Sequence, residues 1–184
     1  MGRESDIAAT ALVKNMIPIS LRPLEPEDLE LMYTMENDPE LWLSTSDPHP
    51  YSKYAIRQYL ANQPQDIFQC GELRNVILLA PQGEAIGFVD IVNFSPSNLR
   101  AEICISILSA HRGKGYGHAS LCKIEQWAKE MLNIRMLYAH ISSQHNPACK
   151  SLFLSSGYTL VATLPLWHKR GMAYEDIDVL TKIL

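Results

Sequence analysis

The chain has 184 residues, of which 47% are hydrophobic and 20% are charged, and its formal net charge is -4 at pH 7. This length and balance predict one folded domain with a hydrophobic core and exclude an intrinsically disordered chain. The mild negative charge argues against a nucleic-acid-binding protein, which usually carries a basic surface.

The cysteines and the apolar segments exclude further classes of protein. The sequence has four cysteines, Cys70, Cys104, Cys122 and Cys149, which form no CxxC pair and no Cys/His cluster with metal-ligand spacing. We therefore expect buried thiols in a reducing compartment and no bound metal. No segment of the sequence is long and apolar enough to cross a membrane, and residues 1–15 lack the uninterrupted apolar stretch of a secretory signal. We therefore expect a cytoplasmic protein.

The first third of the chain predicts one strand and two helices. Pro26 is favoured in the first turn of a helix, and the acidic residues Glu25 and Glu27 beside it suit the positive end of the helix dipole. Three prolines within residues 38–51 predict a loop, because proline interrupts regular structure. The predicted segments are, in chain order, an arm at 1–15, a strand at 17–24, a helix from Pro26, a loop at 38–51 and a helix from Ser52 to residue 62.

The rest of the chain predicts strands that are joined first by tight turns and later by helices. Gln82-Gly83 and residues 95–98 have the composition of turns, and Asn146-Pro147 begins a helix that Gly157 ends. The predicted segments are strands at 73–80, 85–94 and 100–108, a glycine-rich loop at 111–117 that opens an amphipathic helix, a strand at 135–141, a helix from 147, and strands at 158–166 and 174–184. The order β-α-α-β-β-β-α-β-α-β-β predicts the α/β (α+β) class, with a mixed sheet in one domain at residues 16–184.

The glycine-rich loop is the segment that most directly predicts a function. Residues 111–117, His-Arg-Gly-Lys-Gly-Tyr-Gly, join the end of a strand to the start of a helix. Glycines let backbone N–H groups converge and the helix N-terminus adds partial positive charge, so the segment predicts an anion site suited to phosphate. A P-loop would need Ser or Thr after Lys114, and a Rossmann fingerprint would need a glycine at His118. The alternative is a solvated glycine-rich turn.

Several segments resemble the GNAT acetyltransferase superfamily. Residues 112–117 match its pyrophosphate loop, Gln/Arg-x-x-Gly-x-Gly/Ala, and residues 146–158 resemble its Asn-x-x-Ala/Ser…Gly-Phe/Tyr segment. The opening at 21–28 and the tail at 170–176 are similar to the branch that contains ribosomal-protein N-terminal acetyltransferases and spermidine N-acetyltransferases. The resemblance covers residues 17–184 and implies a GNAT-like mixed central sheet of about seven strands with helices on both faces. In such a sheet the fourth and fifth strands splay apart.

The resemblance also implies how acetyl-CoA, the co-substrate, is held in the gap between the splayed strands. Backbone groups of Ile105, Ser106 and Ile107 would hold the pantetheine arm and the thioester. Backbone amides of the glycine-rich loop would hold the pyrophosphate, and a side chain beyond the fifth strand would contact the cofactor from the other side. These residues are Arg112, Gly113, Lys114, Gly115, Tyr116 and Gly117 for the pyrophosphate, and Asn146 for the other side.

The implied reaction is the direct attack of a neutral amine on the thioester carbonyl. An alkylammonium ion has a pKa of about 10, so a general base helps to remove its proton. Strand alternation places Glu102 on the same face as Cys104 and Ser106, and many family members have a working carboxylate at this position, so Glu102 is the expected base. The alternative is a structural carboxylate at the start of the strand, either paired with Arg100 or exposed.

The general acid stays open at this stage. Phe153 stands where many members, including spermidine acetyltransferases, have a tyrosine, and phenylalanine has no proton to give. Four residues are candidate substitutes: Tyr138, His145, Cys149 and Tyr158. The thiolate can also leave unassisted. His140, in the middle of the strand beside the expected cleft, either relays protons or is a buried, hydrogen-bonded structural residue.

The acceptor is not named by the sequence. Eight acidic residues and no Lys or Arg lie between Glu25 and Asp47, and this excess either attracts a cationic acceptor or forms a solvated helix face. Trp42, Tyr33 and Tyr51 either line an acceptor pocket or belong to the core.

Three hypotheses for the function follow from these residues. The first is acetylation of a small-molecule amine such as a polyamine or an amino acid, in a closed pocket. The second is acetylation of a peptide N-terminus, which needs an open groove. The third is a non-catalytic sensor of acetyl-CoA. The resemblance also implies that a homodimer built through the last strands is one of the states open to the chain.

Overall fold

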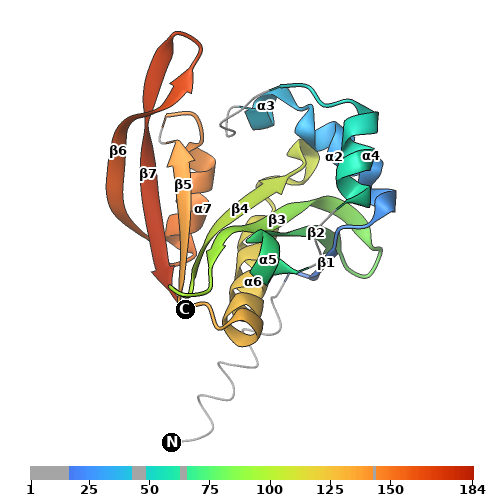
Figure 1. The fold of residues 1–184 in the computed structure, drawn as a ribbon, viewed down its shortest axis with the longest axis horizontal. Helices are drawn as coiled ribbons and strands as arrows, with labels where there is room; N and C mark the ends of the chain where they lie inside the picture. Colours follow the sequence, from blue (N-terminus) through green and yellow to red (C-terminus); the bar gives the residue numbers. More distant parts are fainter. Residues whose placement is uncertain (1–16, 43–48, 63–65, 143) are drawn as a thin grey trace, which may run out of the picture.

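The computed structural model describes residues 17–42, 49–62, 66–142 and 144–184, so the arm predicted at 1–15 lies outside the described residues. A seven-stranded sheet in the order β1-β2-β3-β4-β5-β7-β6 forms the centre of the molecule (Figure 1). The strands are β1 (Ile19–Pro23), β2 (Leu73–Leu79), β3 (Glu84–Ser95), β4 (Arg100–Ile107), β5 (Met136–Ser142), β6 (Thr159–Arg170) and β7 (Ala173–Ile183). The predicted mixed sheet of seven strands is therefore confirmed.

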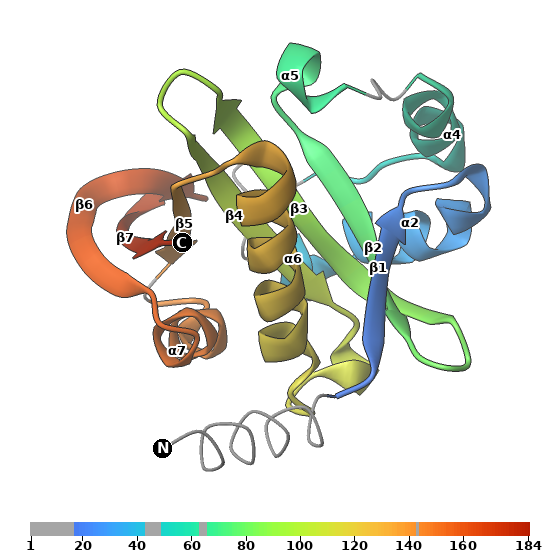
Figure 2. The same cartoon turned by 90° about the horizontal axis from the view of Figure 1, so that it is seen from below.

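Helices cover both faces of this sheet, as the sequence predicted (Figure 2). They are α2 (Leu29–Glu36), α3 (Pro39–Trp42), α4 (Lys53–Ala61), α5 (Ile67–Cys70), α6 (Tyr116–Leu132) and α7 (Pro147–Ser155), with short 3-10 turns η1 (Pro26–Asp28) and η2 (Ser109–His111). No helix in the described part of the chain is long and apolar enough to span a membrane.

Strand alternation divides the core into two clusters. Val76 and Phe88 face α2 and α4, whereas their neighbours Ile77 and Val89 face α6 on the other side of the sheet. All four side chains are at most 3% exposed. Because successive strand residues point to opposite faces, the apolar runs in β2 and β3 fill both layers at once.

The loop predicted at 38–51 was wrong for Pro39–Trp42, which form α3. Proline is tolerated in the first turn of a helix, and the Asp38 carboxylate accepts a hydrogen bond from the Glu40 N–H at 2.9 Å. A proline-rich segment can therefore hold one helical turn when the proline begins it.

The β6 strand continues past its predicted end at Leu166 and includes Pro165. β6 is an edge strand, where a residue without an N–H is tolerated. Pairing shifts between Leu164, opposite Ile177, and His168, opposite Glu175, so residues 165–167 bulge outward. The Leu166 N–H donates to Asp176 within this bulge at 2.8 Å.

The parallel pair β4–β5 is the feature that positions the site. Its pairing is limited to Arg100–Glu102 against Met136–Tyr138. Beyond Glu102, β4 pairs with β3 alone and β5 pairs with β7 alone. The two central strands therefore separate and leave backbone groups of Ile103–Ile107 without a strand on one side (Figure 1).

Candidate active site

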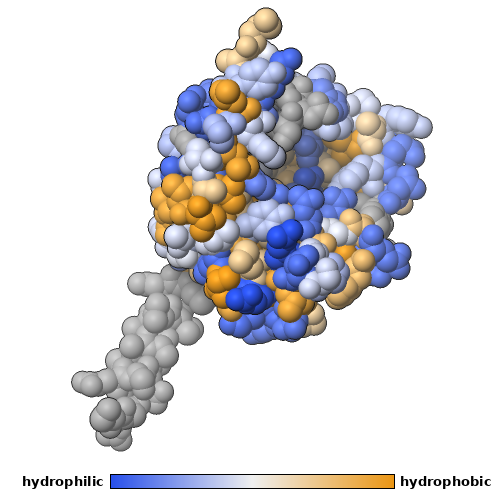
Figure 3. Space-filling view, turned by 60° about the vertical axis from the view of Figure 1, so that its left-hand side comes forward, coloured by the Kyte–Doolittle hydropathy of each residue, from blue (hydrophilic) through white to orange (hydrophobic). Residues whose placement is uncertain are grey.

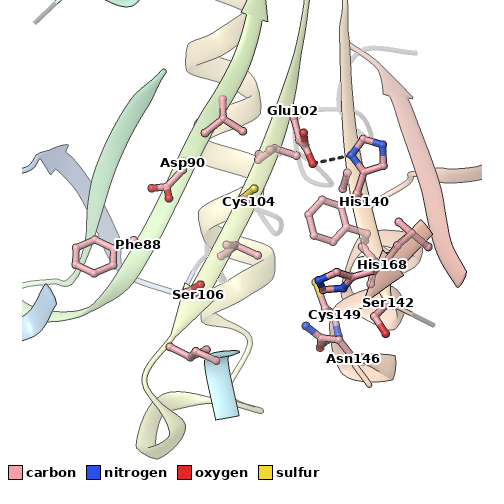
Figure 4. A pocket seen from close by; sticks show the side chains of 18 of the residues that line it. Phe88, Asp90, Glu102, Cys104, Ser106, His140, Ser142, Asn146, Cys149 and His168 are labelled. Atoms are coloured by element: carbon pink, nitrogen blue, oxygen red, sulfur yellow. Dashed lines mark hydrogen bonds and ion pairs between the residues drawn. The ribbon is translucent and has the colours of Figure 1, made fainter. Parts of the chain in front are cut away.

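A cavity of about 850 Å³ opens where β4 and β5 separate. Its walls come from β3 and β4 on one side and from β5, α7 and the bulge of β6 on the other (Figure 4). Residues of α2 and α3 also line it. The lining residues used below are Glu36, Trp42, Arg74, Asp90, Asn93, Glu102, Cys104, Ile105, Ser106, His140, Ser142, Asn146, Cys149, Phe153, Trp167, His168 and Lys169.

A hydrogen bond between Glu102 and His140 spans the gap between the two strands (Figure 4). His140 Nδ1 lies 2.8 Å from Glu102 Oε1. The Asn93 amide donates to the other carboxylate oxygen, Oε2, at 2.9 Å. Asn93 has a positive φ of 52° and sits where the β3–β4 register shifts, and that irregularity turns its side chain toward Glu102.

A second charged cluster lies on the neighbouring strands. Arg74 on β2 donates to Glu36 at 2.6 Å and, through two nitrogens, to Asp90 Oδ2 at 2.9 and 3.1 Å. Burial raises the pKa of Asp90, and the Arg74 charge opposes that rise. When all three groups are charged, two carboxylates face one guanidinium, so the cluster carries one excess negative charge.

The glycine-rich loop joins the end of β4 to the N-terminus of α6. Gly113 and Gly115 have φ values of +72° and +83°, which a residue with a Cβ adopts only with strain. A Cβ on Gly115 would lie 2.5 Å from Ile17 Cδ1. The Arg112 guanidinium donates to the Ile107 carbonyl at 2.8 Å and fixes the loop to β4. The first intrahelical bond runs from the Ala119 N–H to the Gly115 carbonyl, so the amides of residues 113–118 remain available to an anion. The Arg112 amide, which the sequence also assigned to the pyrophosphate, instead donates to the Ser109 carbonyl at 3.2 Å.

The structure brings some predicted site residues together and leaves others outside the cavity. Glu102, Ile105, Ser106 and Asn146 line it. Ile107, the last residue of β4, and the loop residues 112–117, which come after η2, are not among the lining residues. The Asn146 side chain caps α7 by accepting from the Cys149 N–H at 3.1 Å.

The candidates for a general acid are reduced by the structure. Phe153 is 1% exposed and packs edge-to-face on Tyr158, with ring centroids 4.8 Å apart. Tyr158 and Tyr138 do not line the cavity, and burial raises the pKa of both. Cys149 does line it, and burial raises the pKa of its thiol to about 12. A thiol that holds its proton so firmly is a poor general acid near neutral pH.

His145, the fourth candidate, belongs to a cluster around the buried carboxylate of Glu175. This carboxylate accepts from Ser142 at 2.7 Å, His145 at 2.6 Å, His168 at 2.9 Å and Arg170 at 2.8 Å. Burial raises its pKa, but the bonds from Ser142, Arg170 and His145 outweigh burial and lower the pKa to about 2. The cluster joins the end of β5 to the β6–β7 hairpin and so fixes one wall of the cavity.

Half of the eight acidic residues between Glu25 and Asp47 form ion pairs with basic side chains. Asp47 lies outside the described residues. The pairs are Asp28–Arg22, Glu30–Lys53, Glu36–Arg74 and Glu40–Arg112. Of the three aromatic residues proposed for the acceptor pocket, Trp42 lines the cavity, whereas Tyr33 and Tyr51 do not.

The sequence analysis did not predict that five residues line the cavity: Arg74, Asp90, Asn93, Trp167 and His168. Arg74 and Asp90 were detectable in principle, because each is a charge inside an otherwise apolar strand. Asn93 and Trp167 depend on irregular pairing, for which the sequence carries no periodic signal. Within the described part of the chain, no group of three or more His, Cys, Asp or Glu residues could hold a metal ion.

Comparison with known proteins gives a consistent result. The acetyltransferase (GNAT) domain family matches residues 19–159. Spermidine N(1)-acetyltransferase from Vibrio cholerae serotype O1 is 26% identical over 140 residues, which are 76% of this chain and 78% of the relative. The crystal structure of the Vibrio cholerae spermidine N-acetyltransferase in complex with CoA and spermine aligns with a TM-score of 0.80 at 23% identity, over 90% of this chain and 95% of that one. A dodecameric structure of that enzyme aligns with a TM-score of 0.74 at 23% identity, over 90% and 93%.

Proposed function

The chain belongs to the GNAT acetyltransferase family, whose members use acetyl-CoA, and we propose that it acetylates a primary amine of a small cationic molecule, with polyamines as the first candidates. The observation that carries the proposal is the cavity between β4 and β5. It contains a carboxylate–imidazole pair beside a cluster with excess negative charge.

The residues at the strand gap fit acetyl-CoA, which supplies an activated acetyl group as a thioester. Backbone groups of Ile105, Ser106 and Ile107 on the free edge of β4 would hold the pantetheine arm. Amides from Gly113 to Gly117 would hold the pyrophosphate at the N-terminus of α6. Asn146 would contact the cofactor from the opposite wall. Gly115 supports this fit, because its φ of +83° favours a residue without a side chain, and the backbone amides can then approach a phosphate closely.

The charges in the cavity favour a cationic acceptor. When ionised, Glu36, Asp90 and Glu102 place three negative charges in the cavity lining. Arg74 and Lys169 oppose them with two positive charges, so one negative charge remains in excess. A low-dielectric cavity with this excess stabilises a bound cation. Polyamines carry several ammonium groups, and the relatives that the comparison finds are named as spermidine acetyltransferases. A peptide N-terminus has one positive charge and a long neutral chain, so the negative charges of the cavity stabilise it less than they stabilise a polyamine.

The proposal is tested by measuring CoA release from acetyl-CoA with spermidine, spermine, amino acids, aminoglycosides and short peptides. Mass spectrometry of the products identifies the acetylated nitrogen. We expect polyamines to give the highest kcat/KM. A clear preference for peptides would move the protein to N-terminal acetylation. If no amine leads to CoA release while calorimetry still detects acetyl-CoA binding, the result would support a non-catalytic sensor.

The edge strand β6 fits a second copy of the chain as a partner. Leu160, Val161, Leu166 and Trp167 on this strand are 41–67% exposed. Hydrophobic residues gather on the face that Figure 3 presents, with the β6–β7 side turned forward. An exposed apolar edge strand is a favourable place for strand addition or dimerisation. The oligomeric state can be measured by light scattering, and a monomer would contradict this part of the proposal.

A further inference from the structure

We propose that Nε2 of His140 is the atom that removes the proton from the acceptor amine, and that Glu102 is a positioning residue that acts through it. This inference rests on the proposed function, because it assigns a role within the same cavity. It differs from the expectation drawn from the sequence, in which Glu102 itself takes the proton.

Both oxygens of Glu102 are already engaged. Oε1 accepts from His140 and Oε2 accepts from Asn93. The Glu102 side chain is also only 13% exposed, whereas the His140 side chain is 36% exposed. The imidazole is therefore the more accessible of the two groups to an amine that enters the cavity.

The hydrogen bond determines which nitrogen of His140 is the base. An ionised carboxylate can only accept, so Nδ1 must carry the hydrogen that it donates to Glu102. In the neutral imidazole the lone pair then resides on Nε2. Among the described residues, Nε2 makes no hydrogen bond, so it is available for a substrate proton.

Neighbouring groups hold the ring in this orientation. Tyr138, two residues earlier on the same face of β5, packs edge-to-face on the imidazole with ring centroids 5.5 Å apart. Asn93 fixes the Glu102 carboxylate from the other side. A carboxylate that orients an imidazole and stabilises the imidazolium is a recurrent arrangement in enzymes that use histidine as a base.

The acceptor amine loses two protons during the reaction, and His140, solvent and the thiolate of CoA account for both. The ammonium acceptor gives one proton to Nε2, and the imidazolium returns it to solvent. The free amine nitrogen then forms a bond to the acetyl carbon as the carbon–sulfur bond breaks, and the electron pair leaves with sulfur. The second proton of the nitrogen, lost as the amide forms, neutralises the thiolate. Imidazoles suit this exchange better than carboxylates, because they ordinarily titrate close to neutral pH.

The test compares His140→Ala and Glu102→Gln in the pH profile of kcat/KM for the acceptor that the amine panel identifies. His140→Ala should lower kcat by about 100-fold or more, the range of general base catalysis, and should change the pH profile of kcat/KM. Added imidazole should restore part of the rate. Glu102→Gln should lower kcat by a smaller factor, because the glutamine amide oxygen can still accept a hydrogen bond from His140 Nδ1. His49→Gln, an exposed histidine outside the cavity, is the matched control.

A second acceptor separates the catalytic role from a structural one. An amine that is already neutral at the assay pH needs no base, so the loss caused by His140→Ala should shrink with it. Calorimetry with acetyl-CoA checks that the variants still fold and bind. The inference is overturned if His140→Ala keeps its activity within twofold while Glu102→Gln abolishes it. Inactivity of the unaltered protein toward every amine would instead refute the proposed function.

Discussion

Glu175 on β7 and His145, in the segment before α7, lie 2.6 Å apart between Oε2 and Nδ1, although 30 positions separate them in the chain. The same carboxylate accepts from Ser142 at the end of β5. These bonds join the β6–β7 hairpin to the segment that leads to Asn146. One wall of the cavity therefore depends on a single carboxylate that is 3% exposed.

Replacing this carboxylate should destabilise the fold. Glu175→Gln leaves His145, His168 and Arg170 without their common anion, and removal of one partner from a buried ionic cluster typically costs about 3–5 kcal/mol. Urea unfolding should show this decrease in the free energy of unfolding. Glu27→Gln, which removes an exposed carboxylate, is the control and should change it by less than about 0.5 kcal/mol. Equal stability of the two variants would contradict the role of the cluster.

The same residue predicts how stability depends on pH. Its pKa of about 2 in the folded protein lies below the ordinary value of 4.5. A lowered pKa contributes stability that is complete above the unfolded value and is lost as the pH falls from 4.5 toward 2. The contribution is about 3 kcal/mol, from 1.36 kcal/mol for each pKa unit. The difference in unfolding free energy between the wild type and Glu175→Gln should therefore narrow below pH 4.5. A constant difference would show that Glu175 does not titrate as described.

Trp167 offers a test of the part of the cavity wall that the β6 bulge forms. Trp167 and Leu166 lie in the same bulge of β6 and are both 67% exposed, but Trp167 alone of the two lines the cavity. Trp167→Ala should raise the KM for the amine several-fold, because one face of the acceptor loses its contact, with little change in stability. Leu166→Ala is the matched control and should leave the KM unchanged. The interpretation fails if both variants behave alike.

Gly115 offers a test of the pyrophosphate loop. Gly115→Ala strains the loop backbone, because the φ of +83° disfavours a residue with a Cβ, and it also displaces the Ile17 side chain, whose Cδ1 would lie 2.5 Å from that Cβ. We expect acetyl-CoA binding, measured by calorimetry, to weaken at least tenfold. Gly83→Ala imposes a similar φ strain, at +74°, in the β2–β3 turn, where its Cβ meets nothing within 4 Å. This control should lose stability without losing affinity for acetyl-CoA.

Periodic features of the chain predicted the fold well. The helical spacing of Leu121, Ile124 and Ala128 gave the correct helix, because it reflects burial on one face. The turn residues at Gln82-Gly83 and 95–98 gave the correct division into strands. Local exceptions were harder to predict. The turn α3 and the continuation of β6 through Pro165 depend on where a proline falls relative to a helix start or a sheet edge.

The candidate site was predictable only in part. The glycine-rich loop was recognised from a short motif, which acts through local backbone geometry, and Glu102 was selected from strand alternation and the family resemblance. Two contacts of the site, Glu102 with His140 and Glu36 with Arg74, each join residues that are 38 positions apart in the chain. Such contacts depend on strand order and register, so they became visible only once the sheet was assembled.

The claim that acetyl transfer takes place in the gap between β4 and β5 is tested most directly by amide hydrogen exchange with and without acetyl-CoA. We predict slower exchange at the amides of residues 113–118 and along the free edge of β4, from 104 to 107. We predict little change in the groove between α6 and β1, which contains Trp127 and Met131. The account would be contradicted if saturating acetyl-CoA slowed exchange in this groove and left the exchange rates of the loop and of β4 unchanged.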